Sequence, residues 1–313
     1  MSKTAFLFPG QGSQTPGMAQ ELASQSAAAK SVLEQVDEAL GQNLSALMAD
    51  GPVDELTLTA NAQPALFASS LAVIAAIEEV TGKTLADFGD FVAGHSLGEY
   101  SALAAAGVFD VATGAKLLRI RGNSMQDAVP VGEGAMAALI GADIELANQV
   151  VDAAIDAGAV QIANDNAPGQ VVISGSLAGV KAAMAAAQEA GLKRVVELPV
   201  SAPFHSSLMA PAAQAMDAAL SQTDFSVPHL PVYCNVTAAV ETAPDALRKN
   251  LVTQVTGRVR WRETLQSLQA AGVSRFVELG TGKVLSGLVK RTLKDVEIVS
   301  VETLDAIKAE FNA

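Results

Sequence analysis

Residues 91–103 read FVAGHSLGEYSAL and contain the pattern Gly-x-Ser-x-Gly at positions 94–98. FVAG is apolar enough for a short buried strand, and the segment from 95 to Gly107 has the composition of a helix that ends at a glycine. A strand, a sharp turn and a helix form the context in which this pattern predicts a nucleophile elbow. Such a turn exposes the Ser96 hydroxyl at a helix N-terminus, where free N–H groups face developing negative charge. The alternative is a glycine-rich turn in which the serine only caps the helix.

The surrounding segments alternate between short apolar strands and longer helices. Residues 4–8 (TAFLF) predict a buried strand that stops at Pro9 and leads into the tight turn GQGSQ. Helices are expected over most of 17–50, over 63–80 and over 110–127. This alternation predicts an α/β fold with a hydrolase-like core built on a short parallel sheet.

The section from about 131 to 199 has a different order of elements. It predicts a strand, a helix, two strands joined by a turn at 167–169, a second helix capped by Ser176, and a last strand. This βαββαβ order is that of a ferredoxin-like unit. We therefore expect an inserted small subdomain at 131–199 and a catalytic core made of 1–130 and 200–313. Further core elements are expected as strands at 230–236 and 275–279 and as helices at 244–254 and 261–271.

The composition limits the compartment and the partners. Among 313 residues, 33 Asp and Glu outnumber 20 Lys and Arg, and the net charge of -13 disfavours nucleic acid and anionic lipid as partners. The one cysteine, Cys234, excludes an intramolecular disulfide and fits a reducing compartment. The apolar run before Pro9 is too short for a signal peptide, and we expect no stretch of about 18 uncharged apolar residues that could cross a bilayer. A soluble, cytoplasmic protein is therefore predicted.

A serine nucleophile needs a base, and the chain offers three histidines. His95 adjoins Ser96, so its side chain is expected to point elsewhere on so sharp a turn. His229 lies between prolines in a polar loop, which is typical of a solvated histidine. His205 follows the last strand of the small subdomain, and it is favoured by elimination and by this setting. The group that orients it stays open, because a backbone or amide oxygen could replace an acid; the candidate carboxylates are Asp110, Asp127, Asp165 and Glu197.

Several ordered motifs resemble one family across nearly the whole chain. These motifs are FPGQGSQ at 8–14, GHSLGEYSAL at 94–103, Arg121-Gly122 with Met125-Gln126, NAPGQVVISG at 166–175, SAPFHSSLM at 201–209 and VELGTGKVLSGL at 277–288. In them the sequence is similar to the malonyl-CoA:acyl-carrier-protein transacylases of bacterial fatty acid synthesis, an acyltransferase family.

The resemblance implies a role for individual residues. Ser96 would carry the acyl group and His205 would act as general base and acid. Arg121 would pair with the free carboxylate of the malonyl group. The backbone N–H groups of Gln11 and Leu97 would form the oxyanion hole, and the backbone carbonyl of Gln254 would orient the histidine. The chain departs from the family after Gln254, where Arg258 stands in place of a frequent proline. The substrate-binding residues implied are Arg121, Gln11, Met125, Asn166 and Phe204.

The resemblance also implies a reaction and its partners. The malonyl group would pass from malonyl-CoA to the phosphopantetheine thiol of acyl carrier protein through a serine ester, by ping-pong kinetics, to supply fatty acid chain extension. Neither a metal nor a cofactor is expected, and a monomer is expected. Two alternatives share some of these features: a serine esterase or thioesterase, and a non-enzymatic carrier-binding module.

An anionic carrier would be repelled by a protein with a net negative charge, so its docking surface needs a local excess of basic residues. Between Arg258 and Lys294 the sequence holds eight basic residues and only two acidic ones, Glu263 and Glu278. We expect part of this stretch to dock the carrier and the nucleotide phosphates, whereas a solvated helix face is the alternative for any one residue. The residues chosen for this docking are Lys283, Lys290 and Arg291.

Overall fold

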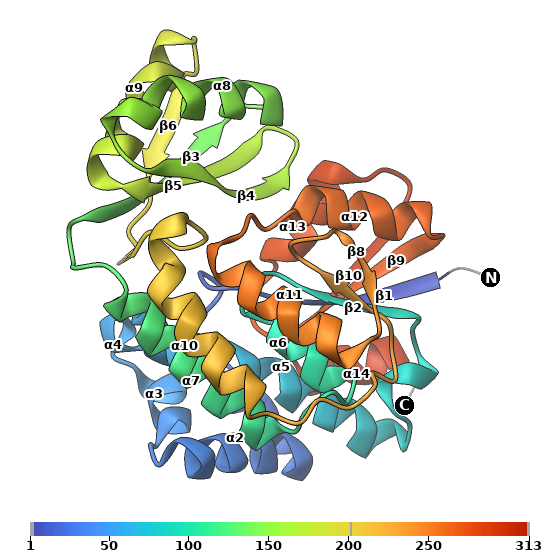
Figure 1. Ribbon diagram of the computed structural model, residues 1–313. Helices are drawn as coiled ribbons and strands as arrows, with labels where there is room; N and C mark the ends of the chain where they lie inside the picture. The colour runs from blue at the N-terminus through green and yellow to red at the C-terminus, as the bar shows by residue number, and fades with distance from the viewer. Residues whose placement is uncertain (1–2, 201, 312–313) are drawn as a thin grey trace.

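Two β-sheets form the framework of the molecule (Figure 1), which the computed structural model describes for residues 3–200 and 202–311. Within these residues the larger sheet has six strands in the order β10-β9-β1-β2-β7-β8. Its strands are β1 (Lys3–Phe8), β2 (Phe91–Gly94), β7 (Val232–Cys234), β8 (Ala239–Glu241), β9 (Val273–Leu279) and β10 (Glu297–Val301). The outer limits of the predicted domains, residues 1 and 313, and the first residue of the motif at 201–209 lie outside the described residues.

Strand β1 lies in the middle of this sheet and pairs in parallel with β2 and β9. Ala5, Phe6, Leu7 and Phe8 are fully buried, as expected of a parallel strand that is covered on both faces. The prediction of a short parallel sheet is wrong at one edge, because β8 pairs with β7 in antiparallel register. A four-residue turn joins these two strands, which leaves no room for the crossover that a parallel pair needs.

Helix α5 (Thr59–Thr81) is the central helix of the core on one face of the larger sheet. It begins four residues before the predicted start, and Pro64 lies inside its second turn. The expectation that no segment could span a bilayer needs correction. By length and composition α5 passes that test, but 89% of its most apolar 18-residue window is buried inside the protein.

Helices α2, α6, α7 and α14 pack directly against α5, and α10 packs on α7 and α11 further out. Helices α10 and α14 were not predicted from the sequence. On the opposite face, Trp261, Leu265 and Leu285 cover β1 and β9 from α12 and α13. The helices of the larger part are α1 (Gln20–Gln25), α2 (Ala27–Leu40), α3 (Leu44–Asp50), α4 (Val53–Thr57), α6 (Gly98–Ala105), α7 (Val111–Asp127), α10 (Ala210–Ser221), α11 (Pro244–Thr256), α12 (Trp261–Ala270), α13 (Val284–Thr292) and α14 (Leu304–Phe311).

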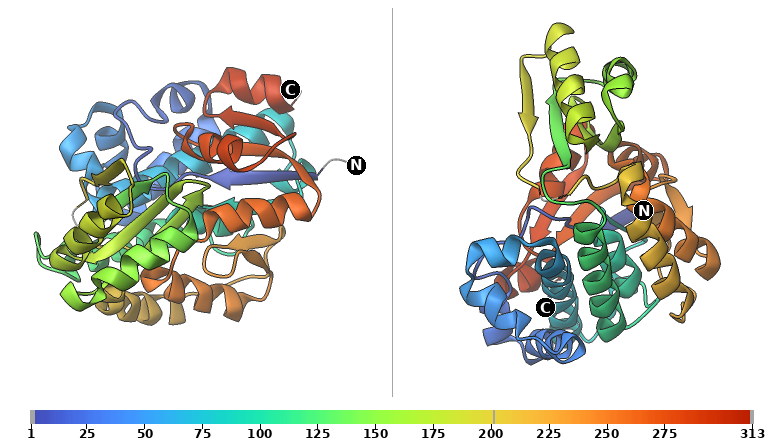
Figure 2. Two further views of the ribbon diagram at one scale, coloured as in Figure 1. Left: turned by 90° about the horizontal axis from the view of Figure 1, so that it is seen from above. Right: turned by 60° about the vertical axis from the view of Figure 1, so that its left-hand side comes forward.

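The smaller sheet is antiparallel and stands above the larger part as a separate lobe, with two helices on its outer face (Figures 1 and 2). Alternate residues of β3 point to opposite sides: Ala137 and Leu139 join a core under these helices, and Met136 faces the main core. The predicted strand and helix order is confirmed, including Ser176 as a helix cap. The elements are β3 (Gly134–Ile140), α8 (Ile144–Ala154), β4 (Val160–Ala167), β5 (Gln170–Ser176), α9 (Leu177–Glu189) and β6 (Arg194–Glu197).

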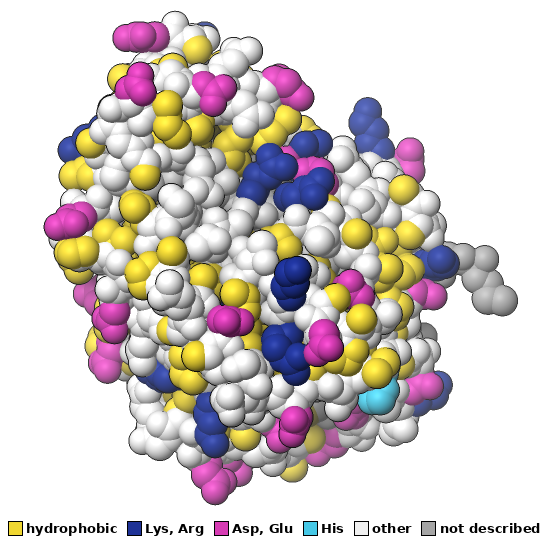
Figure 3. All heavy atoms as spheres, in the orientation of Figure 1, with side chains coloured by type: hydrophobic (Ala, Val, Ile, Leu, Met, Phe, Trp, Pro, Cys, Tyr) yellow, Lys and Arg dark blue, Asp and Glu magenta, His cyan; other side chains and the backbone are white. Residues whose placement is uncertain are grey.

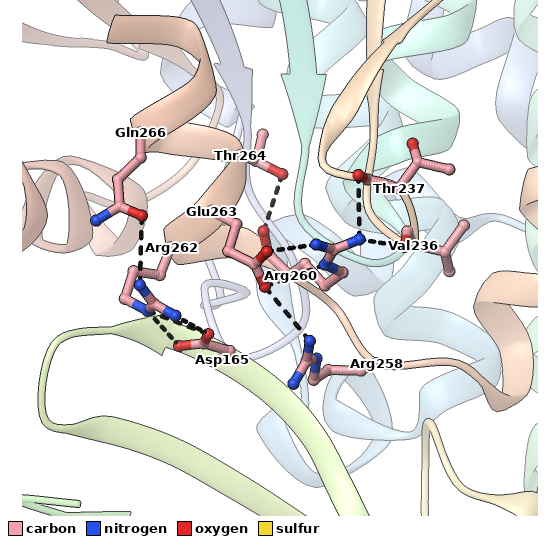
Figure 4. Close-up of polar contacts among 9 residues, drawn as sticks. All are labelled: Asp165, Val236, Thr237, Arg258, Arg260, Arg262, Glu263, Thr264 and Gln266. Carbon is pink, nitrogen blue, oxygen red and sulfur yellow. Dashed lines mark hydrogen bonds and ion pairs between the residues drawn. The ribbon is translucent and has the colours of Figure 1, made fainter. Parts of the chain in front are cut away.

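Backbone pairing and an ion pair tie the small lobe to the large one. Val259, in the segment between α11 and α12, donates its N–H to Ala163 O and accepts from Asp165 N, at 2.8 and 2.9 Å. The Arg262 guanidinium binds both carboxylate oxygens of Asp165, which is buried on β4 (Figure 4). We call these contacts the interlobe clamp. Figure 3 shows Lys and Arg side chains beside acidic ones where the two lobes meet.

Candidate active site

The turn between β2 and α6 holds Ser96 in a conformation that few non-glycine residues adopt. Its φ is 54°, in the left-handed region. A Cβ at position 94 would lie 1.8 Å from Gly98 O, and a Cβ at position 98 would lie 2.3 Å from Phe8 O. Both glycines of the pattern are therefore required by contact, since any side chain would push the elbow open.

Ser96 and His205 meet although 109 residues separate them in sequence. Ser96 Oγ lies 2.8 Å from His205 Nε2. His205 Nδ1 lies 2.9 Å from the carbonyl oxygen of Gln254, which can only accept, so Nδ1 carries the proton and Nε2 is free to accept from the serine. A backbone carbonyl at the end of α11 thus orients the ring, in the position of the acid of a serine-histidine-acid triad.

The carboxylates considered from the sequence do not reach this histidine. Asp110 caps α7 by accepting from Thr113 N, and Asp165 belongs to the interlobe clamp. Glu197 is exposed at the end of β6, and Asp127 lies in the last turn of α7. Of the other histidines, His229 is exposed as expected.

Burial sets the protonation state of the base. His205 is 4% exposed, and this burial, with the nearby Arg121 charge as a second cause, lowers its pKa to about 3. A pKa below the ordinary range means that the imidazole stays neutral through neutral pH. The lone pair on Nε2 is therefore available for the serine proton at physiological pH.

Arg121 is a buried guanidinium aimed at the serine. It is 2% exposed, and its Nη2 donates to Ser96 Oγ at 3.1 Å and to Gln254 Oε1 at 2.9 Å. Its Nη1 donates to Gln63 Oε1 at 2.8 Å. Within the described residues no carboxylate forms an ion pair with it, so it can take one from a ligand. Arg119, two residues earlier, instead binds the side chains of Asn61 and Gln42.

A cavity of about 410 Å³ lies between the lobes beside these groups. Its roof comes from the small lobe, where Met136, Val172 and Leu198 supply apolar surface. Of the predicted catalytic and substrate-binding residues, all line this cavity except Gln254, which binds Arg121 from behind. Those lining residues are Gln11, Ser96, Leu97, Arg121, Met125, Asn166, Phe204 and His205.

Two backbone amides border the cavity near the serine. Within residues 3–200 and 202–311, neither Gln11 N–H nor Leu97 N–H donates to a protein acceptor. Leu97 directly precedes the first residue of α6, whose N-terminal amides also point toward this end. The pair is therefore placed to receive an anionic oxygen of a ligand.

Three polar residues near the site were not singled out from the sequence. Gln63 holds Arg121 from α5, Asn235 holds the elbow from the end of β7, and Glu99 is buried on α6. Each lies far from Ser96 in sequence or inside a motif already assigned to the serine, and none has a neighbouring pattern that indicates its contact. A polar residue directly after a short apolar strand, as at Asn235, was the one available indication.

The basic residues predicted to dock a carrier differ in their pairing. Arg260 and Arg262 bind Glu263 and Asp165 respectively, and Arg275 binds two glutamates. By contrast Lys283, Lys290 and Arg291 are exposed on or beside α13, and in the described part of the chain no carboxylate pairs with them. Among the eight basic residues that the structure describes between Arg258 and Lys294, the three chosen from the sequence are therefore free to bind an anionic partner, and Lys294 is a fourth.

The fold and this site together define a class: an α/β protein in which a serine on a sharp strand-to-helix turn contacts a buried histidine at the end of a strand of a mixed sheet. A family model described as acyl transferase domain matches residues 5–308. Malonyl CoA-acyl carrier protein transacylases of Bacillus subtilis and Escherichia coli K12 are 48% and 42% identical, covering 97% and 99% of this chain and 96% and 99% of theirs.

Two similar solved structures carry names of the same family. The acyl-carrier-protein-S-malonyltransferase of Bartonella henselae is 51% identical, with a TM-score of 0.97, and the match covers 100% of this chain and 99% of that one. A malonyl-transacylase in complex with its type II PKS acyl-carrier protein is 39% identical, with a TM-score of 0.95, over the full length of both chains. The chain belongs to the malonyl CoA-acyl carrier protein transacylase family and is an acyltransferase.

Proposed function

We propose that this protein transfers a malonyl group from malonyl-CoA to the phosphopantetheine thiol of acyl carrier protein, through an ester on Ser96. One observation carries the proposal: a serine oxygen 2.8 Å from a buried imidazole nitrogen and 3.1 Å from a buried arginine, in one cavity. The names of the full-length relatives support the donor and the acceptor.

In the first half-reaction, Ser96 Oγ attacks the thioester carbonyl while His205 Nε2 takes its proton. The carbonyl oxygen becomes an oxyanion between the N–H groups of Gln11 and Leu97; losing one such donor typically costs about 3 kcal/mol in the barrier. The carbon–sulfur bond then breaks, and the imidazolium returns its proton to the coenzyme A thiolate. Malonyl-Ser96 and free coenzyme A remain.

The second half-reaction reverses these steps with a new thiol. His205 takes the proton of the carrier's phosphopantetheine thiol, whose sulfur attacks the ester of Ser96. The serine oxygen leaves and recovers the proton, so the malonyl thioester of the carrier forms and the enzyme is restored. A covalent intermediate between two substrates predicts ping-pong kinetics.

In this proposal, Arg121 makes the enzyme selective for malonyl over acetyl groups. Its planar guanidinium can hold the free carboxylate of malonyl with two parallel hydrogen bonds. Met125 and Phe204 line the same cavity and limit the bulk near the acyl group, and Asn166 adds a polar group from the small lobe. An acetyl group leaves the arginine without an anion, which disfavours its transfer.

The proposal includes the setting of the enzyme. The two half-reactions need no metal and no resident cofactor, since malonyl-CoA and phosphopantetheine enter as substrates. We propose a soluble, cytoplasmic monomer, and a ferredoxin-like unit for the small lobe inserted at 131–199 into a hydrolase-like core.

Product analysis with purified malonyl-CoA tests transfer against hydrolysis. Without carrier, the acyl-enzyme is expected to accumulate with little free malonate; addition of holo carrier is expected to discharge it to malonyl-carrier. Apo carrier, which lacks the thiol, is the matched control and should leave the acyl-enzyme intact. Rapid release of malonate without carrier would instead identify a thioesterase, and carrier binding without any acyl-enzyme would identify a binding module.

Charge reversal on α13 tests the carrier surface. The double variant Lys290→Glu and Arg291→Glu is expected to raise the KM for the carrier at least about fivefold, because an anionic partner meets repulsion in place of attraction. The acylation rate at saturating malonyl-CoA should stay unchanged. Lys30→Glu with Lys181→Glu, on α2 and α9, gives the same change in net charge as a control. Equal KM values for the two double variants would exclude this surface.

A further inference from the structure

Glu99 is a buried carboxyl group that the proposed cycle does not use. It lies in the first turn of α6, three residues after Ser96, and is fully buried. Burial raises its pKa to about 7. A carboxyl group in such a place costs free energy unless its contacts compensate for the lost water. Its contacts therefore indicate why the position holds a glutamate.

One oxygen of Glu99 accepts two hydrogen bonds from residues of two different elements. Oε2 lies 3.0 Å from Asn235 N and 2.8 Å from Gln254 Nε2. Asn235 follows β7 and Gln254 lies in the last turn of α11, so the two donors come from separate elements. All three residues are fully buried, so these bonds are shielded from bulk solvent.

The first contact supports the nucleophile. Asn235 Oδ1 accepts from Ser96 N at 2.7 Å, and Asn235 Nδ2 donates to Gly94 O at 2.7 Å. Its side-chain amide therefore closes a ring across the elbow and holds the left-handed backbone of Ser96. The bond from Asn235 N to Glu99 fixes the residue that closes this ring.

The second contact supports the arginine. Gln254 Oε1 accepts from Arg121 Nη2 at 2.9 Å, whereas its Nε2 donates to Glu99 and to Ser96 O. A side-chain amide can turn over and exchange its oxygen and nitrogen. Glu99 Oε2 accepts from this nitrogen, as does Ser96 O, and the two acceptors together favour the orientation in which the oxygen faces the guanidinium. The reversed amide would place N–H groups against Arg121.

We propose that Glu99 is a positioning residue that sets both the acylation rate and the preference for a malonyl group. It does so by holding the supports of Ser96 and Arg121 with one oxygen. The inference rests on the proposed function of Ser96 and Arg121. Because the two supports share an acceptor, a change that moves this oxygen alters rate and selectivity together.

Three substitutions of Glu99 distinguish the position of its acceptor oxygen from the charge and from the volume of its side chain. Glu99→Gln keeps an acceptor oxygen at the same reach, Glu99→Asp keeps the charge but withdraws the oxygen, and Glu99→Met keeps the volume without an acceptor. The readouts are the first-order acylation rate per titrated active site and the ratio of malonyl to acetyl acylation. We expect Glu99→Gln to retain both within about threefold, and Glu99→Asp and Glu99→Met to lose at least tenfold in each.

The outcomes distinguish the possible roles. If Glu99 only supported the fold, the melting temperature and the number of active sites would fall, while rate and ratio per site stayed at the wild-type values. Glu278→Gln, a second buried glutamate that accepts from Leu285 N and Ser286 N, is the matched control for this effect. If Glu99→Met does not fold, the acylation rates and ratios of the other two variants decide between the roles. A positioning role predicts higher values for Glu99→Gln, whereas a role of charge alone predicts higher values for Glu99→Asp.

Two results would overturn different statements. Rate and ratio within twofold of wild type in Glu99→Asp would overturn the positioning role of Glu99. Failure of the unaltered protein to form an acyl-enzyme would overturn the proposed function itself. The experiment therefore separates the two, because each comparison begins with the acylation of the unaltered protein.

Discussion

Ser96→Ala protein incubated with malonyl-CoA is expected to show no covalent adduct by intact-protein mass spectrometry, whereas the unaltered protein gains one malonyl group. Ser96 Oγ is the hydroxyl that contacts His205 Nε2, and alanine leaves the imidazole without an oxygen to activate. Transfer to the carrier should fall by at least about 10⁴-fold, the scale seen when a nucleophile is removed from a serine-histidine unit.

Ser101→Ala is the matched control for this result. Ser101 is a buried serine on α6, the helix that follows the turn at Ser96, and it does not line the cavity. Its alanine variant should form the adduct as the unaltered protein does. An adduct that persists in Ser96→Ala, at any residue, would contradict the proposed nucleophile.

Arg121→Ala is expected to lower acylation by malonyl-CoA by about 10²- to 10³-fold and to leave acylation by acetyl-CoA much less affected. Removing one partner of a buried ion pair typically costs about 3–5 kcal/mol, because the remaining charge stays in the cavity without compensation. The rate of malonyl acylation in Arg121→Lys should fall between the rates of Arg121→Ala and the unaltered protein. An ammonium group offers a point charge but no planar fork for the carboxylate. Single-turnover acylation with each donor measures the ratio.

Arg119→Ala controls for loss of an arginine from α7. The Arg119 side chain binds Gln42 and Asn61, outside the cavity. The malonyl-to-acetyl ratio of this variant should equal that of the unaltered protein. An unchanged ratio in Arg121→Ala would show that the guanidinium does not read the carboxylate, and selectivity would then have to come from other groups in the cavity.

Local patterns predicted the parts of this molecule that depend on neighbours in sequence. The elbow at 94–98 was accessible because close contact admits only glycine on both sides of Ser96, and this leaves a pattern of fixed spacing. Ser176 as a helix cap and the order of elements in the small lobe follow from the same short-range chemistry. Residue roles beyond Ser96 and His205 came from the resemblance to a family.

The remaining features depend on contacts between distant segments. Strands β8 and β10 are short or half-exposed, so neither forms an apolar run of its own, and the start of α5 was hidden by Pro64. Glu99 reads as part of the serine motif, yet its partners lie more than 130 residues away. No periodicity in the sequence reports which buried polar groups will share a hydrogen bond.

The interlobe clamp has a consequence for how substrates reach the serine. Val259 and Arg262 hold β4 directly, and the same strand carries Asn164 and Asn166 into the cavity wall. A rotation of the small lobe would have to break the main-chain hydrogen bonds of Val259 and the ion pair between Arg262 and Asp165. We therefore expect the two lobes to keep their separation during the reaction. Under the proposed function, the phosphopantetheine arm would then enter a cavity of constant width while the carrier protein stays at the surface.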